Sequence, residues 1–235
     1  MKLQCDIHLP ASKSESNRAL MIAAYGGFAP DFQNLSDSQD TFVLATAIEC
    51  VRQGKRIIDA ADCGTTARFM TTFLAMHEGN WLLTGSERMR QRPMAPLVEA
   101  LKELGAEIQY VGQQGFLPLQ IEGKTICGGK ISLDMSQSSQ FASSLLLTAP
   151  MWSQGLELEL LGQLNSLPYL NLTLSMMQHF GAKAKRVERK VIVESSCYQS
   201  RPFVVSADWS AASYWYEMAA RSRSEERRVG KECRS

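Results

Sequence analysis

The sequence lacks the features that would tie it to a membrane or a nucleic acid. No apolar run approaches the roughly 20 residues of a membrane-spanning helix. The first residues, MKLQCDIHLP, have no long apolar core of the kind found in signal peptides. The formal net charge is only +1, so bulk electrostatics favour no polyanionic partner. We therefore expect a cytoplasmic protein with neither a nucleic-acid nor a membrane partner.

Metal and nucleotide motifs are also missing. The six cysteines are scattered without a CxxC pair, which argues against structural zinc and indicates reduced thiols. The three histidines show no catalytic or metal-binding spacing; His77 and His179 lie near expected helix ends, where capping or surface roles are favoured. Neither a GxGxxG nor a P-loop pattern occurs. No metal and no nucleotide cofactor is indicated.

A repeated α/β unit is present in a chain of ordinary globular composition, with 235 residues and 45% hydrophobic side chains. Its first copy is expected to start a helix at Gly64, followed by the strand WLLTG and a helix that opens at Arg92-Pro93 and ends at Gly105. The short strands EIQYV, LPLQI and KISLDM are expected to close this copy.

The second copy is expected to start a helix at Ser138, followed by the strand LELELL, a helix that opens near Pro168 and ends at Gly181, and two short strands. A third helix start of this kind occurs at Ser210. A long period that mixes helices and strands predicts α/β units sharing one core. Chance similarity between amphipathic helices is the alternative.

Small, hydroxyl-rich helix starts recur along the chain. Helix N-termini carry unpaired N–H groups and partial positive charge, so they bind anions. Ordinary N-capping explains any one of them, but a shared axis would bring them to one surface. They are Ser12–Arg18, Asp62–Thr66, Ser138–Gln140 and Ser210–Ser213.

Cations accompany these starts. Ser14 and Arg18 share a helical face beside Lys13, and lysine and arginine suit phosphate and carboxylate ligands. Three arginines crowd the segment SERMRQRPM, where repulsion favours a nearby anion. Solvated basic segments are the alternative in both places. The candidate acids and bases are Asp40, Asp62 and Asp208.

The final residues, 223–235, read RSEERRVGKECRS, with five basic and three acidic side chains. We interpret this segment as a non-native tail, since it resembles the translation of a sequencing adapter; a solvated tail is the alternative. Residues 1–222 are then expected to form one domain whose third unit is incomplete, in a natural protein that continues further.

Six segments together resemble the 5-enolpyruvylshikimate-3-phosphate synthase family: KSESNR, DCGTTAR, RMRQRPM, SQSSQF, NSLPY and ADWSAASY occur in the family's order. The resemblance covers Leu9 to about Ala220. It implies an α/β fold, an inside-out α/β barrel in which each of two lobes contains three βαβαββ units with helices inside. It also implies that the second lobe is missing here.

The family transfers the enolpyruvyl group of phosphoenolpyruvate to the 5-hydroxyl of shikimate 3-phosphate, in chorismate biosynthesis. The resemblance implies a transferase that needs no cofactor and no metal, and that is a monomer at full length. The family's aspartate base and a glutamate belong to the second lobe, so this chain is expected to bind ligand without turnover.

The resemblance also implies roles for ten residues. Lys13 would be catalytic and contact phosphoenolpyruvate, which Gly64 and Arg92 would also bind. The remaining seven would hold shikimate 3-phosphate: Ser14, Arg18, Ser138, Ser139, Gln140, Ser166 and Tyr169. Among them, Arg18 would bind the carboxylate of shikimate 3-phosphate, and Gln140 would lie between the two ligands.

Two residues depart from the family pattern. Asp62 replaces a frequent asparagine, and its carboxylate should repel phosphoenolpyruvate unless it turns away or is protonated. Phe69 replaces a frequent proline after Arg68. Two other functions stay open: a stand-alone small-molecule-binding lobe, and a relative of the UDP-N-acetylglucosamine enolpyruvyl transferase. That relative lacks the KSxSNR pattern and has a cysteine in the loop matching Glu87–Arg92.

Overall fold

The computed structural model describes residues 6–136, 138–164 and 166–221. The interpreted tail, 223–235, lies outside them. The helices are α1 (Lys13–Gly26), α2 (Gln39–Arg52), α3 (Gly64–Ala75), α4 (Glu87–Arg90), α5 (Ala95–Glu103), α6 (Ser139–Thr148), α7 (Leu167–His179) and α8 (Trp209–Arg221), with a 3-10 turn at Ala149–Met151. The strands are β1 (Phe32–Gln33), β2 (Ile57–Asp59), β3 (Gly79–Thr84), β4 (Glu107–Tyr110), β5 (Leu119–Gly123), β6 (Gly129–Asp134), β7 (Leu156–Leu161), β8 (Ala184–Val187), β9 (Lys190–Val193) and β10 (Phe203–Val204).

Two four-stranded sheets with the same topology confirm the repeat. Their strand orders are β2-β3-β5-β4 and β6-β7-β9-β8. In each, the first two strands are parallel and the last two join as antiparallel neighbours. Each sheet therefore belongs to one βαβαββ unit, as the family resemblance implies.

The predicted boundary between the two units was wrong. KISLDM, expected to close the first unit, forms most of β6 and opens the second, because it pairs in parallel with β7 from Gly129↔Leu156 to Asp134↔Leu161. The strand that opens the first unit is β2, which sequence patterning missed. With only three residues, it is too short to show an alternating pattern.

Matching helix ends support the repeat at the level of single hydrogen bonds. Gly105 and Gly181 have φ of 95° and 90° after α5 and α7. The next N–H groups, of Ala106 and Ala182, donate to the carbonyls of Leu101 and Met177, at 2.8 and 2.9 Å. This is the Schellman arrangement, in which a left-handed residue satisfies the last carbonyls of a helix.

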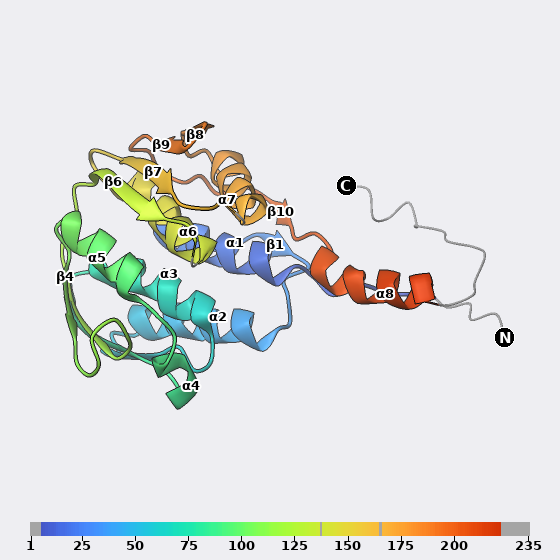
Figure 1. The fold of residues 1–235 in the computed structure, drawn as a ribbon, viewed down its shortest axis with the longest axis horizontal. Helices are drawn as coiled ribbons and strands as arrows, with labels where there is room; N and C mark the ends of the chain where they lie inside the picture. The colour runs from blue at the N-terminus through green and yellow to red at the C-terminus, as the bar shows by residue number, and fades with distance from the viewer. Residues whose placement is uncertain (1–5, 137, 165, 222–235) are drawn as a thin grey trace.

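The start of α5 differs from its prediction. The helix begins at Ala95 with a proline in its first turn, and not at Arg92-Pro93. A residue before proline is biased away from helical conformation. Arg92 and Pro93 instead lie in the link between the short helix α4, which ends at Arg90, and α5; both helices are labelled in Figure 1.

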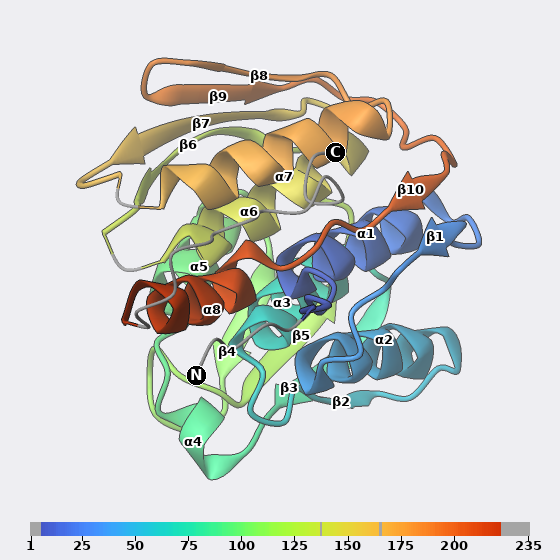
Figure 2. The ribbon, with the colours of Figure 1, turned by 90° about the vertical axis from the view of Figure 1, so that its right-hand side faces the viewer.

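The helices pack inside the sheets. α1, α3 and α6 contact one another, and each of the other three packs against two of them: α2 against α1 and α3, α5 against α3 and α6, and α7 against α1 and α6. Figure 2 shows the second sheet outside α6 and α7. In β6 the buried and exposed residues alternate, with Ile131 and Leu133 facing the helices. The hydrophobic core therefore lies among the helices and between them and the inner faces of the sheets, which form the outer walls.

Hydroxyl groups link the three central helices. The Thr72 hydroxyl of α3 lies 2.7 Å from that of Ser144 in α6. Ser144 also donates to the carbonyl of Arg68, at 2.7 Å. The hydroxyls of Tyr25 in α1 and Thr148 in α6 lie 2.5 Å apart. Because buried hydroxyls need hydrogen-bond partners, these pairs oppose any sliding of the three helices along one another.

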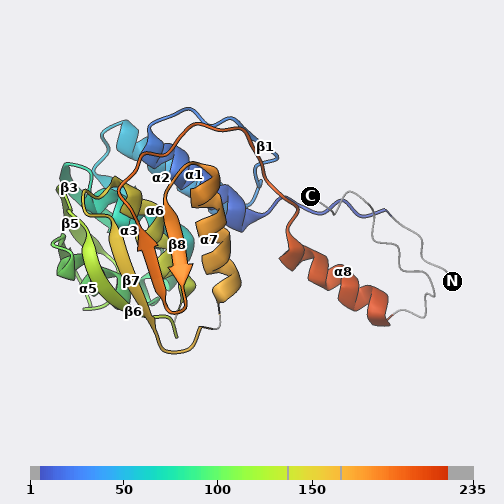
Figure 3. The ribbon, with the colours of Figure 1, turned by 90° about the horizontal axis from the view of Figure 1, so that it is seen from above.

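The last described helix, α8, projects away from this body (Figures 1 and 3). Only Ala212 is buried, while large side chains such as Tyr214 and Met218 are 71% and 62% exposed. A helix is present at the predicted third start, but it does not pack among the other helices.

The described residues contain no helix that is long and apolar enough to span a membrane. The four cysteines in the described ranges (Cys50, Cys63, Cys127 and Cys197) are unpaired thiols.

Replacing Gly105 by alanine is expected to lower the free energy of unfolding by about 1–2 kcal/mol, because left-handed backbone is unfavourable for residues with a Cβ. A Cβ there meets nothing within 4 Å, so the cost is conformational. Gly112→Ala is the control, since its Cβ has ordinary space and its φ is not positive. Urea unfolding measures both; equal stability of the two variants would contradict the Schellman assignment.

Candidate anion-binding site

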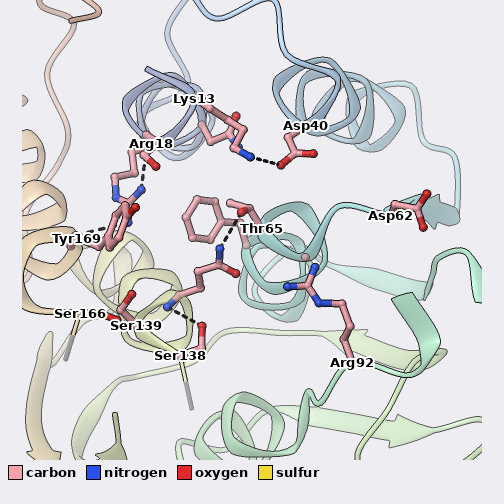
Figure 4. A pocket seen from close by; sticks show the side chains of 15 residues that line it. Lys13, Arg18, Asp40, Asp62, Thr65, Arg92, Ser138, Ser139, Ser166 and Tyr169 are labelled. Carbon is pink, nitrogen blue, oxygen red and sulfur yellow. Dashed lines mark hydrogen bonds and ion pairs between the residues drawn. The ribbon is translucent and has the colours of Figure 1, made fainter. Parts of the chain in front are cut away.

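One cavity of about 440 Å³ lies where the central helices begin (Figure 4). All ten residues predicted as site residues line it. The lining consists of Lys13, Ser14, Asn17, Arg18, Asp40, Asp62, Gly64, Thr65, Phe69, Arg92, Ser138, Ser139, Gln140, Ser166 and Tyr169. The prediction that helix starts converge is confirmed for α1, α3 and α6. The fourth start, at Ser210, contributes nothing to the cavity.

Lys13 opens α1 at the cavity wall. Its Nζ lies 2.8 Å from Oδ2 of Asp40, and both side chains are partly exposed. The hydrogen bond to Asp40 raises the pKa of Lys13, against the opposing effect of partial burial. Lys13 therefore stays protonated and faces the cavity as a point charge.

Arg18 is buried one turn further along α1. Its guanidinium donates to the hydroxyls of Thr173 at 2.8 Å and Ser143 at 3.1 Å, and to the Ser14 carbonyl at 2.9 Å. Burial lowers the pKa of Arg18 to about 10, so it is still charged at neutral pH. In the part of the chain that the structure describes, no carboxylate lies within ion-pair distance of it. A buried cation of this kind is suited to an anionic ligand.

The start of α3 brings Gly64 against Arg92. A Cβ on Gly64 would lie 2.4 Å from Nη1 of Arg92, so only glycine allows the guanidinium this position. The N-cap is Cys63, whose Sγ accepts from the Thr66 N–H at 3.3 Å. The helix start and the guanidinium thus present positive charge to the same space.

Gln140 joins α6 to α3 across the cavity floor. Its Nε2 donates to the Thr65 hydroxyl at 3.0 Å, and its Oε1 accepts from Arg68. The Ser138 hydroxyl caps α6 by accepting from the Gln140 N–H, at 3.2 Å. The amide side chain of Gln140 is therefore held by two partners from α3, Thr65 and Arg68.

Ser166 and Tyr169 come from the first turn of α7. Ser166 is the N-cap residue, although its side chain does not cap the helix. Tyr169 is 43% exposed and extends toward the cavity beside Arg18 (Figure 4). Its carbonyl accepts from Thr173, at 2.8 Å.

Of the three arginines in SERMRQRPM, only Arg92 lines the cavity. Arg90 instead donates to the Gly85 carbonyl and the Thr84 hydroxyl, at 3.0 and 3.1 Å. Arg88 is exposed on α4. One cation therefore faces the cavity, and another stabilises the loop that carries it.

The two departures from the family pattern also lie at the cavity. Asp62 accepts a hydrogen bond from the Ser86 hydroxyl and points away from the other labelled side chains (Figure 4), which reduces its repulsion of an anion. Phe69 is buried beneath Arg18, whose guanidinium carbon lies 6.0 Å from the ring centroid. Asp208, the third candidate acid, instead accepts from the Ser210 N–H at the start of α8, at 2.8 Å.

Arg68 is a functional candidate that sequence reasoning left out of the site. It is buried, and none of the described residues accepts a hydrogen bond from its Nε. Burial lowers the pKa of Arg68 to about 10, and the charge of Arg92 acts in the same direction. Its position one helical turn after Gly64 was the available signal, because both residues share a face of α3.

Asn17, Asp40 and Thr65 line the cavity as well but were not among the ten residues to which the resemblance gave roles; Asp40 was predicted only as a candidate acid or base. Asn17 and Thr65 lie within the KSESNR and DCGTTAR segments, so those segments were the signal. Asp40 lies on α2, and its pairing with Lys13 depends on how the helices pack.

No cluster of three or more His, Cys, Asp or Glu side chains that could hold a metal occurs within residues 6–136, 138–164 and 166–221. The charges at the cavity belong to Lys13, Arg18 and Arg92, with Asp40 and Asp62 each engaged by a neighbouring group. The arrangement defines a class of protein: an α/β lobe whose converging helix N-termini and cations form a cavity suited to small anions.

Comparisons with known proteins narrow this class. Residues 34–227 match the family described as EPSP synthase (3-phosphoshikimate 1-carboxyvinyltransferase). A relative of that name from Bacteroides fragilis is 46% identical over 222 residues, covering 94% of this chain and 53% of the relative. Another from Sulfurovum sp. is 35% identical, covering 93% and 57%. The EPSP synthase structure from Acinetobacter baumannii shares the fold, with a TM-score of 0.75 at 21% identity over 89% of this chain and 52% of that one.

The chain belongs to the EPSP synthase family. It spans about half the length of the curated relatives that it matches.

Replacing Arg92 by alanine is expected to weaken binding of inorganic phosphate about tenfold or more, the usual effect of removing a charged hydrogen-bond donor. Arg88→Ala is the matched control, because it removes the same charge from the adjacent exposed helix outside the cavity. Isothermal titration calorimetry compares them. Equal losses in both variants would show that only general electrostatic attraction acts here.

Replacing Gly64 by alanine is expected to displace the Arg92 guanidinium, because the new Cβ would overlap it. The end of an arginine side chain moves at little cost, so thermal stability should stay close to that of the wild type. Phosphate affinity should fall about threefold to tenfold, as for a lost or distorted polar contact. Melting and calorimetry on the same sample check both; unchanged affinity would contradict the close approach of Arg92.

Proposed function

We propose that this chain forms the shikimate 3-phosphate-binding part of a 3-phosphoshikimate 1-carboxyvinyltransferase. The whole protein would transfer the enolpyruvyl group of phosphoenolpyruvate to the 5-hydroxyl of shikimate 3-phosphate. The observation that carries this proposal is the cavity, in which three cations and three helix starts meet in a chain of the EPSP synthase family.

Shikimate 3-phosphate would lie between α1, α6 and α7. Its carboxylate would accept hydrogen bonds from Arg18, whose fixed guanidinium suits a planar carboxylate. Ser14 would add a hydroxyl contact, and Tyr169 would line the ring. Its phosphate would bind at the start of α6. Three hydroxyls would hold it there, those of Ser138, Ser139 and Ser166.

Phosphoenolpyruvate would lie on the side of α3. Arg92 and the backbone around Gly64 would bind it, since a helix start and a guanidinium together favour an anion. Gln140 would lie between the two ligands. Lys13 would contact phosphoenolpyruvate near the reacting atoms, where a protonated amine stabilises developing negative charge.

The addition–elimination reaction needs a proton donor for the methylene carbon and a base for the 5-hydroxyl. Among the described residues that line the cavity, the only carboxylates are Asp40, paired with Lys13, and Asp62, hydrogen-bonded to Ser86. We therefore propose that this chain binds shikimate 3-phosphate and does not turn it over. The division of the chain at residue 222, the cytoplasmic location and the monomeric state of the intact protein stay predictions.

Shikimate 3-phosphate is expected to raise the melting temperature of the chain, since a ligand stabilises the state that binds it. UDP-N-acetylglucosamine, the substrate of the related transferase, should leave it unchanged. Arg18→Lys should weaken shikimate 3-phosphate binding about tenfold, because lysine cannot form the two-pronged contact.

With both substrates present, a coupled assay should detect no phosphate release. Stabilisation by the nucleotide sugar alone would refute the substrate assignment. Measurable turnover, with enzyme contamination excluded by the Arg18→Lys variant, would refute the proposal that the chain is inactive.

A further inference from the structure

Two segments almost 200 residues apart lie side by side at the beginning of α1. The segment after β10 runs past the first turn of α1 on its way to α8 (Figure 2). Ala11 and Ala207 form an antiparallel bridge. The Asp208 N–H donates to the Pro10 carbonyl, at 2.8 Å. The turn that carries Lys13 and Ser14 is thus in direct contact with residues 206–208.

The residues Ser12-x-x-Glu15 have the spacing of a capping box. In that motif the serine side chain caps the N3 backbone, and the glutamate reaches back to the N–H of the serine. The first half is present, since the Ser12 hydroxyl accepts from the Glu15 N–H at 3.3 Å. The second half is not formed within the helix.

Ser206 takes the place of the missing half. The Ser12 N–H donates to the Ser206 carbonyl, at 2.8 Å. The Ser206 N–H donates to Oε2 of Glu15, also at 2.8 Å. The capping box is therefore opened, and the backbone of a distant segment is inserted into it with both its donor and its acceptor satisfied.

Glu15 places a negative charge beside a cavity that is suited to anions. A carboxylate in the turn that presents Lys13 and Ser14 to the cavity repels the anions for which the cavity is suited. The Glu15 carboxylate accepts a partly buried hydrogen bond from the Ser206 N–H. A residue without a side-chain acceptor at position 15 could not form this bond.

We propose that Glu15 is a positioning residue for the anion cavity. By binding the Ser206 N–H, it fixes the first turn of α1 against the segment 205–208, which keeps Lys13 and Ser14 at the cavity wall. The ligand named in the test rests on the proposed function; the hydrogen bond to Ser206 does not.

Three variants separate this role from simple charge and simple stability. Glu15→Ala removes the acceptor. Glu15→Gln removes the charge and keeps an amide oxygen that can accept from Ser206. Glu49→Ala is the matched control, because it removes an exposed helical glutamate on α2 whose partner is the neighbouring Gln53.

Affinity for shikimate 3-phosphate is measured by calorimetry well below the melting temperature of every variant. Glu15→Ala is expected to raise the Kd about tenfold, Glu15→Gln to stay within about twofold of the wild type, and Glu49→Ala to leave it unchanged. If charge repulsion dominated, Glu15→Ala and Glu15→Gln would both bind more tightly, and the proposal would fail. Wild-type affinity in Glu15→Ala would also overturn it.

Hydrogen exchange without ligand tests the hydrogen bond by itself. In Glu15→Ala the Ser206 amide should exchange at least about tenfold faster, because its acceptor is gone. The Val205 amide, which donates to the Gln33 carbonyl at 3.0 Å, should change little and serves as the internal reference. Equal acceleration of both amides would indicate general destabilisation and overturn the positioning role.

The two proposals fail in different ways. If the wild-type chain does not bind shikimate 3-phosphate, the proposed function is wrong, and the Ser206 exchange still decides whether Glu15 holds that segment. If the wild type binds and Glu15→Ala binds equally well, only the positioning role is wrong.

Discussion

The mutual packing of α1, α3 and α6 is the constraint on which the rest of this structure depends. Three helices can pack closely about one centre only where the side chains between them are small, and the hydroxyl side chains of Thr72, Ser144 and Thr148 occupy such contacts. Their hydrogen bonds fix the relative depth of the helices. Because the helices are held at one depth, their N-termini open at one end of the body, and the sheets remain outside as walls.

The same packing buries two positive charges. Arg18 and Arg68 are buried among the helices without a carboxylate partner in the described residues, and burial lowers the pKa of each to about 10. A buried charge without a counterion is costly. Hydroxyls and carbonyls offset part of that cost for Arg18. An anionic ligand would offset the rest of that free-energy cost, so the cavity is suited to ligands that carry negative charge.

Local structure was largely predictable because its causes lie within a few residues. Gly105 and Gly181, which follow α5 and α7, mark helix ends with a left-handed backbone conformation. The small residues at positions 64 and 138 mark helix starts. Prediction failed where strand pairing decided the outcome. KISLDM has the pattern of a strand in either unit, and only its register with β7 assigns it to the second.

By itself, the sequence determined the repeat, the hydroxyl-rich helix starts and ten of the fifteen residues that line the cavity, since ordered motifs and turn chemistry are local properties of the chain. Only the tertiary structure decided that three of the four helix starts converge, and that Asp40 pairs with Lys13. It likewise decided that Glu15 binds Ser206 instead of closing its own capping box. These outcomes depend on contacts between residues far apart in the chain, and such contacts follow from how helices pack rather than from the pattern of any one segment.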